Sequence, residues 1–98
     1  MKNLKALKKV LANHKEEIQQ RFKIKEIGVF GSFVRKEQNR KSDIDISIEF
    51  ETGFETFDNY MDLKFFLEEL IGLKVDLVVK DAIREELRES IFAEMVYV

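Results

Sequence analysis

Apolar and polar residues alternate from residue 43 to residue 50, and this is the clearest pattern in the chain. Successive side chains of a β-strand point to opposite faces of a sheet, so the alternation predicts a half-buried strand. One face carries the apolar residues Ile44, Ile46, Ile48 and Phe50, and the other carries Asp43, Asp45, Ser47 and Glu49. The second face of this strand therefore begins with two aspartates.

Hydrophobic spacing predicts the other elements. Leu4, Leu7, Leu11 and Ile18 recur at helical intervals and indicate an amphipathic helix over residues 3–21. Further strands are expected at residues 24–30 and 75–79, and further helices at 32–37, 57–71 and 81–93, with Gly72 ending the third helix and Asp81 capping the last. The order α-β-α-β-α-β-α is an α/β two-layer pattern in a single domain over residues 1–98.

The two aspartates of the alternating strand point to metal binding. Residues two apart in a strand lie about 6.6 Å apart and project the same way. Two carboxylates this close repel each other, and a divalent cation between them removes that repulsion. A solvated strand face would also accept an Asp-x-Asp pair, so the pair needs support from other residues.

Asp76 supplies part of that support. It interrupts the apolar strand at residues 75–79, where an aspartate needs a polar partner or a metal. If this strand neighbours the strand of Asp43 and Asp45, three carboxylates converge, and three carboxylates suit a site that holds two metal ions.

Gly31-Ser32 follows one predicted strand and opens a short predicted helix. Glycine lets backbone amides approach a ligand, and the start of a helix offers free N–H groups that suit phosphate oxygens. Arg35 and Lys36 carry positive charge that a triphosphate could use. A Gly-Ser pair alone is typical of an ordinary turn, and it gains weight only from its position just before the Asp43–Asp45 strand.

Composition narrows the class of protein. The chain has 98 residues, no cysteine and a net charge of −2, which excludes disulfides, thiolate metal sites and a strong electrostatic preference for nucleic acid. It lacks an apolar run long enough to cross a membrane and an apolar signal segment, so we expect a cytoplasmic location. His14 is interpreted as a packing or surface residue, and the phenylalanines Phe30, Phe33, Phe65 and Phe66 as core residues rather than base-stacking platforms.

Together these residues resemble a known family. Gly31-Ser32, ten intervening residues, Asp43-Ile44-Asp45 and a later Asp76 are similar to the DNA polymerase β-type nucleotidyltransferase superfamily, and within it to the minimal nucleotidyltransferases that accompany HEPN proteins in prokaryotic toxin–antitoxin pairs. Matching segments include Val29–Arg35, Ser42–Ile46, Lys74–Val78 and Met95–Val98. The family often has Arg-Gly where this chain has Arg35-Lys36.

The resemblance implies a nucleotidyltransferase fold, with helices packed on a small mixed β-sheet, and a set of roles. Asp43, Asp45 and Asp76 would be the catalytic carboxylates and would bind two Mg²⁺ ions, while Gly31, Ser32 and Arg35 would bind the nucleotide. Such enzymes transfer a nucleoside monophosphate to a hydroxyl group and release pyrophosphate. In the toxin–antitoxin members, AMP passes from ATP to a tyrosine of the HEPN partner.

Two other functions remain open from the sequence. The chain could be an antitoxin that neutralises its partner by contact alone, with its apolar end at Ile91-Phe92 and Met95–Val98 as a contact surface, although that segment also suits core packing or a short strand. It could also modify a small molecule, although such enzymes carry a further substrate domain. Because the chain is short, we expect another copy or a partner chain to complete the acceptor pocket.

Overall fold

The structure is a computed structural model that describes residues 3–37 and 43–98. The predicted loop at residues 38–42, which includes Arg40, Lys41 and Ser42, lies outside the described residues. Within the described part, the elements are α1 (Leu4–Asn13), α2 (Lys15–Phe22), β1 (Ile24–Phe30), α3 (Ser32–Arg35), β2 (Ile44–Phe50), α4 (Phe57–Ile71), β3 (Val75–Val79), the 3-10 turn η1 (Lys80–Ala82), α5 (Glu85–Glu94) and β4 (Val96–Tyr97).

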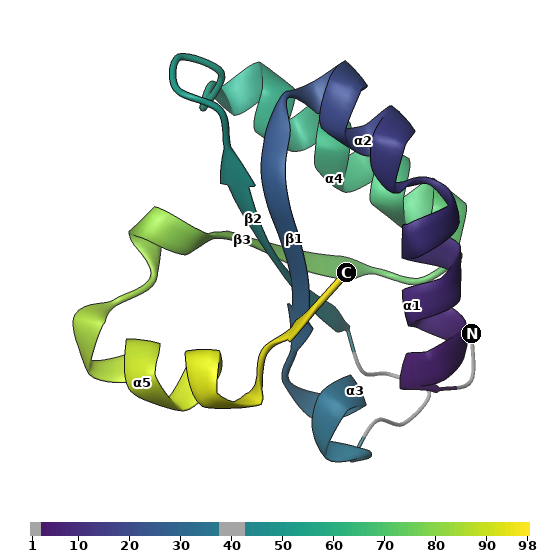
Figure 1. Ribbon diagram of the computed structural model, residues 1–98, viewed down its shortest axis with the longest axis vertical. Coiled ribbons are helices and arrows are strands. Elements are labelled where there is room, and N and C mark those ends of the chain that lie inside the picture. Colours follow the sequence, from purple (N-terminus) through teal and green to yellow (C-terminus); the bar gives the residue numbers. More distant parts are fainter. Residues whose placement is uncertain (1–2, 38–42) are drawn as a thin grey trace.

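The four strands form one mixed sheet in the order β3-β2-β1-β4. β1 is antiparallel to both β2 and β4, whereas β2 and β3 are parallel. A parallel pair needs a crossover connection, which α4 provides. Figure 1 shows α1, α2 and α4 grouped on one side of the sheet, with α5 standing apart from them. The prediction of a mixed α/β fold is confirmed.

The core lies between the sheet and these three helices. It is built from the apolar faces that the sequence pattern predicts, and the isoleucines of β2 are at most 1% exposed. Its largest fully buried side chains are Leu7, Leu11, Ile18, Ile27, Val29, Ile44, Ile46, Ile48, Leu63 and Leu67. Since one face of β2 is occupied by this core, Asp45 and Glu49 must lie on the other face.

Local hydrogen bonds set the starts and ends of the helices. The side chain of Asn3 accepts a bond from the N–H of Ala6 at 2.9 Å and caps α1, and the Thr56 hydroxyl accepts one from the N–H of Asn59 at 3.2 Å and caps α4. Gly72 ends α4 as predicted, in the left-handed conformation with φ of 81°. Within the described residues, no helix is long and apolar enough to cross a membrane.

The prediction of one long first helix is wrong. The chain leaves the helical conformation at His14, which has φ of −111° and ψ of 6°, so α1 and α2 are separate helices. The ring Nδ1 of His14 lies 3.0 Å from the carbonyl oxygen of Val10. Both helices keep their apolar residues on the sheet, and for this reason hydrophobic spacing alone does not reveal the break.

The last helix also differs from the prediction. Asp81 does not cap it, because residues 80–82 form the 3-10 turn η1 and the helix begins only at Glu85. Between the turn and the helix, Ile83 has an extended backbone and a side chain that is only 6% exposed. This buried, extended residue separates the turn from the helix. The end of the chain forms β4, which pairs with β1 at Gly28 and Val29, so Val96 and Tyr97 form a short strand.

The phenylalanines divide between core and surface. Phe30 and Phe33 are buried as predicted, and Phe66 packs against the core. Phe65 is 57% exposed, so its assignment to packing is wrong. Adjacent residues of a helix point about 100° apart, and in α4 Phe66 takes the position that faces the core.

Candidate active site

The turn at Gly31 passes directly over Asp45. Gly31 has φ of 79°, a conformation that side chains rarely adopt, and a Cβ placed on it would lie 2.8 Å from Cγ of Asp45 and closer still to Oδ2. Only glycine fits here, because both the backbone angle and the space exclude a side chain. Position 31 therefore allows the backbone to approach the carboxylate.

The helix that follows this turn is short. The sequence predicts a helix over residues 32–37, whereas α3 covers Ser32–Arg35, and Lys36 ends it in the left-handed conformation with φ of 61°. A single helical turn has a much smaller dipole than a long helix. The turn therefore offers local groups such as the Ser32 hydroxyl to an anion rather than the field of a long helix.

Parallel pairing of β2 with β3 brings two of the predicted carboxylates together. Asp45 and Asp76 are register partners, and they lie close enough for the charge of Asp76 to act on the Asp45 carboxylate. Asp45 is half-buried and Asp76 is exposed. The backbone N–H of Ser32 favours the charged form of the Asp45 carboxylate, and Gly31 lies against the same carboxylate, so the turn and the carboxylate pair adjoin each other.

The electrostatics of Asp45 reflect this crowding. Burial, which is the largest cause, and the interaction with Asp76 together raise the pKa of Asp45 to about 6. The N–H of Ser32 lowers the pKa of Asp45, and the charge of Asp43, the smallest of the causes, raises it. The aspartate pair thus carries negative charge that is poorly compensated by the protein itself.

Asp43 is the third predicted carboxylate, and it stands apart. β2 begins at Ile44 rather than at residue 43, so Asp43 lies just before the strand and is exposed. Within residues 3–37 and 43–98, no group of three or more His, Cys, Asp and Glu side chains is arranged to hold a metal ion. The structure therefore brings Asp45 and Asp76 into contact, whereas Asp43 acts on Asp45 only through its charge.

The donor set nevertheless fits a divalent cation. Carboxylate oxygens are the hard ligands that Mg²⁺ prefers, and burial and the charge of Asp76 both disfavour the charged form of Asp45, which a bound cation would favour. The glycine at position 31 lets the turn backbone lie against Oδ2 of Asp45, where a Cβ would clash. Asp45 and Asp76 are the residues that would hold such an ion, with Asp43 next to them in sequence.

Arg35 has partners that the sequence did not reveal. Its Nη1 donates to both carboxylate oxygens of Glu94, at 3.1 and 3.0 Å, and its Nε donates to Glu37 at 3.0 Å. Glu94 also accepts the N–H of Gly31 at 3.0 Å. The hydrogen bonds that Arg35 donates to these two carboxylates, Glu37 first, raise the pKa of Arg35. The contact of Arg35 with phosphate stays a prediction, and Nη2 is the guanidinium nitrogen that would make it.

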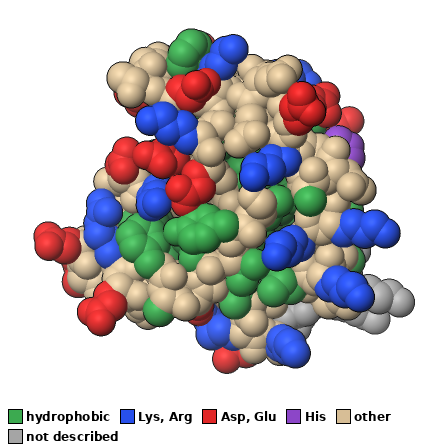
Figure 2. All heavy atoms as spheres, viewed as in Figure 1, with side chains coloured by type: hydrophobic (Ala, Val, Ile, Leu, Met, Phe, Trp, Pro, Cys, Tyr) green, Lys and Arg blue, Asp and Glu red, His purple; other side chains and the backbone are tan. Residues whose placement is uncertain are grey.

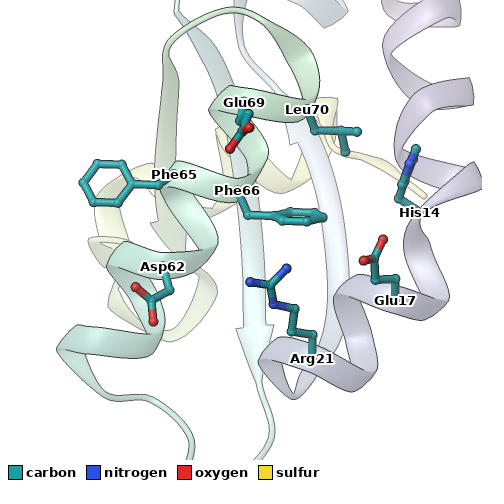
Figure 3. Close-up of a pocket in the computed structure, with 8 residues that line it drawn as sticks. All are labelled: His14, Glu17, Arg21, Asp62, Phe65, Phe66, Glu69 and Leu70. Carbon is teal, nitrogen blue, oxygen red and sulfur yellow. The ribbon is translucent and has the colours of Figure 1, made fainter.

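A cavity of about 640 Å³ lies elsewhere, between α2 and α4. Figure 3 shows the Arg21 guanidinium directed toward the Phe66 ring at this cavity, and the distance from its Cζ to the ring centroid is 5.2 Å. Acidic side chains, among them Glu17 and Asp62, also line it. The cavity belongs to the helical layer, whereas Asp45 and Asp76 are on the opposite face of the sheet, so it is not part of the carboxylate site.

Comparison with known proteins gives a consistent result. The family model described as a nucleotidyltransferase domain matches residues 11–98. The protein adenylyltransferase MntA of Thermococcus cleftensis is 40% identical over 98 residues, which cover all of this chain and 98% of that protein.

Two solved structures share the fold. One, provisionally assigned as a minimal nucleotidyltransferase, is 32% identical with a TM-score of 0.75 and covers 92% of this chain and 93% of its own. The other is the MNT antitoxin in complex with a tri-AMPylated HEPN toxin of Shewanella oneidensis, 19% identical with a TM-score of 0.65, covering 91% of this chain and 69% of its own. The second likeness concerns the fold alone.

The glycine turn over Asp45, the Asp45–Asp76 pair and the match over residues 11–98 agree with one another. The chain belongs to the nucleotidyltransferase domain family, and it is a nucleotidyltransferase similar to the MntA protein adenylyltransferases.

Proposed function

We propose that this protein transfers AMP from ATP to a tyrosine hydroxyl of a HEPN-type toxin, requires Mg²⁺ and acts as the antitoxin of that pair. The observation that carries the proposal is the contact between the Gly31–Ser32 turn and the Asp45–Asp76 pair. The similarity to MntA supports the transfer of AMP to a protein, and the AMPylated HEPN toxin bound to the MNT antitoxin supports the partner.

Different residues of the site act on the phosphates, the metal ion and the acceptor. Gly31 and Ser32 hold the phosphates, and Asp45 and Asp76, with Asp43 beside them, hold Mg²⁺. When bound, Mg²⁺ neutralises charge on the triphosphate and lowers the pKa of the acceptor hydroxyl. Asp76 lies on the exposed side of the pair, where it can receive the acceptor's proton.

The transfer itself is a single displacement at the α-phosphorus. The tyrosine oxygen forms a bond to the α-phosphorus, and the bond from that phosphorus to the bridging oxygen of the β-phosphate breaks. Pyrophosphate leaves with the electron pair, and the tyrosine proton passes to Asp76. The turn contributes by holding the α-phosphorus in line with the acceptor.

The test is an incubation with Mg²⁺, α-labelled ATP and the HEPN protein encoded beside this gene. The proposal expects label on a tyrosine of that protein and its loss in Asp45→Asn and Asp76→Asn. Glu49→Gln is the matched control, because Glu49 lies on the same strand but is outside the carboxylate pair. The proposal fails if the parent protein leaves the partner unlabelled. If Asp45→Asn and Asp76→Asn then still neutralise the toxin fully, the result favours an antitoxin that acts by contact.

A further inference from the structure

Glu94 joins two segments of the site that are distant in sequence. It is the last residue of α5, and Gly31 and Arg35 precede it by 63 and 59 positions. Its Oε1 accepts the Gly31 N–H at 3.0 Å and an Arg35 Nη1 bond at 3.1 Å, while its Oε2 accepts a second Nη1 bond at 3.0 Å. One carboxylate therefore ties the turn backbone to the arginine that ends α3.

Glu94 reaches the turn from the side opposite to Asp45. In the sheet order β3-β2-β1-β4, Asp45 lies on β2, while Glu94 precedes β4, and β1 runs between them into Gly31. The turn is consequently contacted on both sides: its backbone at Gly31 lies against the Asp45 carboxylate, and the Gly31 N–H donates to Glu94. This placement leaves the Asp45 side of the turn facing the carboxylate pair.

The environment of Glu94 also separates it from the rest of its helix. Its side chain is 23% exposed, although α5 contains no fully buried residue. Figure 1 shows α5 away from the other long helices, and Figure 2 shows hydrophobic, acidic and basic side chains mixed on the side where α5 lies. The covered carboxylate of Glu94 is therefore explained by its bonds to the turn and not by the packing of α5.

We propose that Glu94 is a positioning residue for the nucleotide: it holds the Gly31–Ser32 turn and Arg35 in the geometry that the triphosphate requires, without touching the reacting atoms. This inference rests on the proposed function. A partly buried acceptor bonded to both a backbone N–H and a guanidinium restricts the turn before the ligand arrives, and restriction of that kind improves affinity. The opposite role, in which Glu94 occupies the place of a phosphate and competes with it, predicts the opposite change in affinity.

Binding of a non-hydrolysable ATP analogue with Mg²⁺ measures this role directly. We expect Glu94→Ala to weaken binding about tenfold or more, because it removes the acceptors of Gly31 and Arg35 together. Glu94→Gln keeps an acceptor oxygen but loses the charge, so its binding should be intermediate. Glu86→Ala is the matched control, because Glu86 of α5 also pairs with an arginine, Arg84, which precedes the helix, but Glu86 is exposed and has no bond to the turn.

Kinetics and spectroscopy separate positioning from general structure. In the transfer reaction, KM for ATP should rise more than kcat falls in the Glu94 variants. In ¹H–¹⁵N spectra without nucleotide, the Gly31 amide should shift in both Glu94 variants and stay unchanged in Glu86→Ala. If Glu94→Ala does not fold, Glu94→Gln and Arg35→Lys carry the same test.

Three outcomes overturn the inference. Unchanged affinity in a folded Glu94→Ala protein would make the contact purely structural. Tighter binding in that variant would show that Glu94 competes with phosphate. Absence of binding in the parent would remove the proposed function itself, which distinguishes that failure from the other two.

Discussion

The two faces of β2 have different tasks, although they share one backbone. Toward the helices, Ile44, Ile46 and Ile48 are at most 1% exposed and belong to the core. On the other face, Asp45 has its pKa raised to about 6 by burial and by the charge of Asp76. One face is built from burial that favours folding, and the other retains charge repulsion that opposes it. Substitutions on the two faces should therefore have separable effects.

The largest effect should follow from Asp76→Asn. Without a second ionised carboxylate beside Asp45, cation binding and proton acceptance are both impaired, so transfer of AMP should fall by about 10²- to 10³-fold or more. Steady-state labelling of the partner measures the rate, and circular dichroism checks the fold. A folded Asp76→Asn protein with the parent rate would contradict the assignment of the open face to chemistry.

Ile46→Ala tests the opposite face. Ile46 is completely buried, and its truncation should lower the free energy of unfolding by roughly 2–5 kcal/mol through lost burial and the cavity left behind. Urea unfolding gives the change. In the fraction that remains folded, affinity for the ATP analogue should stay close to that of the parent, and a loss of affinity as large as that of the Asp76 variant would break the separation between the faces.

Asp45→Asn should stabilise the protein when no divalent ion is present. The native state holds the Asp45 proton more tightly than the unfolded chain does, so the parent loses stability as pH rises from about 4 to about 6. The asparagine variant avoids this loss. Thermal unfolding in EDTA should show a higher Tm than the parent at pH 7.5 and little difference at pH 4. Added Mg²⁺ should stabilise the parent at pH 7.5 more than the variant, and a pH-independent difference would contradict the cause given for the shift.

The smallest effect concerns the end of α3. Lys36 has φ of 61° where the resembling family often has glycine, and this conformation is unfavourable for a residue with a side chain. Lys36→Gly should raise the free energy of unfolding by roughly 0.5–1 kcal/mol. Gly72→Ala is the mirror experiment, because Gly72 has φ of 81° and a Cβ added there would meet nothing within 4 Å, so strain alone should destabilise it. Equal signs for both variants would refute the argument.

Local sequence patterns were sufficient to predict the bounds of several elements and the acidic face of β2 that points away from the helices. β1, α4 and β3 have the predicted bounds, since branched apolar runs end at Gly31 and Gly72. The pairing of Asp45 with Asp76 could only be stated conditionally, because it depends on which strands become neighbours. The break at His14 and the turn before α5 escaped prediction because the apolar spacing continues through both.

Glu94 shows the limit of reading a sequence locally. It lies in an acidic helix, where a solvated role is the ordinary interpretation. Its contact with the turn depends on β4 pairing with β1, which brings the end of α5 beside Gly31. A useful indication would have been that Glu94 directly precedes an apolar segment, Met95–Val98, that could join the sheet.

The bond between Gly31 and Glu94 also has a consequence for the order of folding. Its partners are 63 positions apart, so it closes a long loop, and contacts of that kind form slowly because the chain must first lose much of its freedom. β1, β2 and the helix between them can associate through nearer contacts. The turn should then reach its final shape late, together with the docking of β4, and in a refolding experiment the capacity to bind nucleotide should appear after most of the secondary structure has formed.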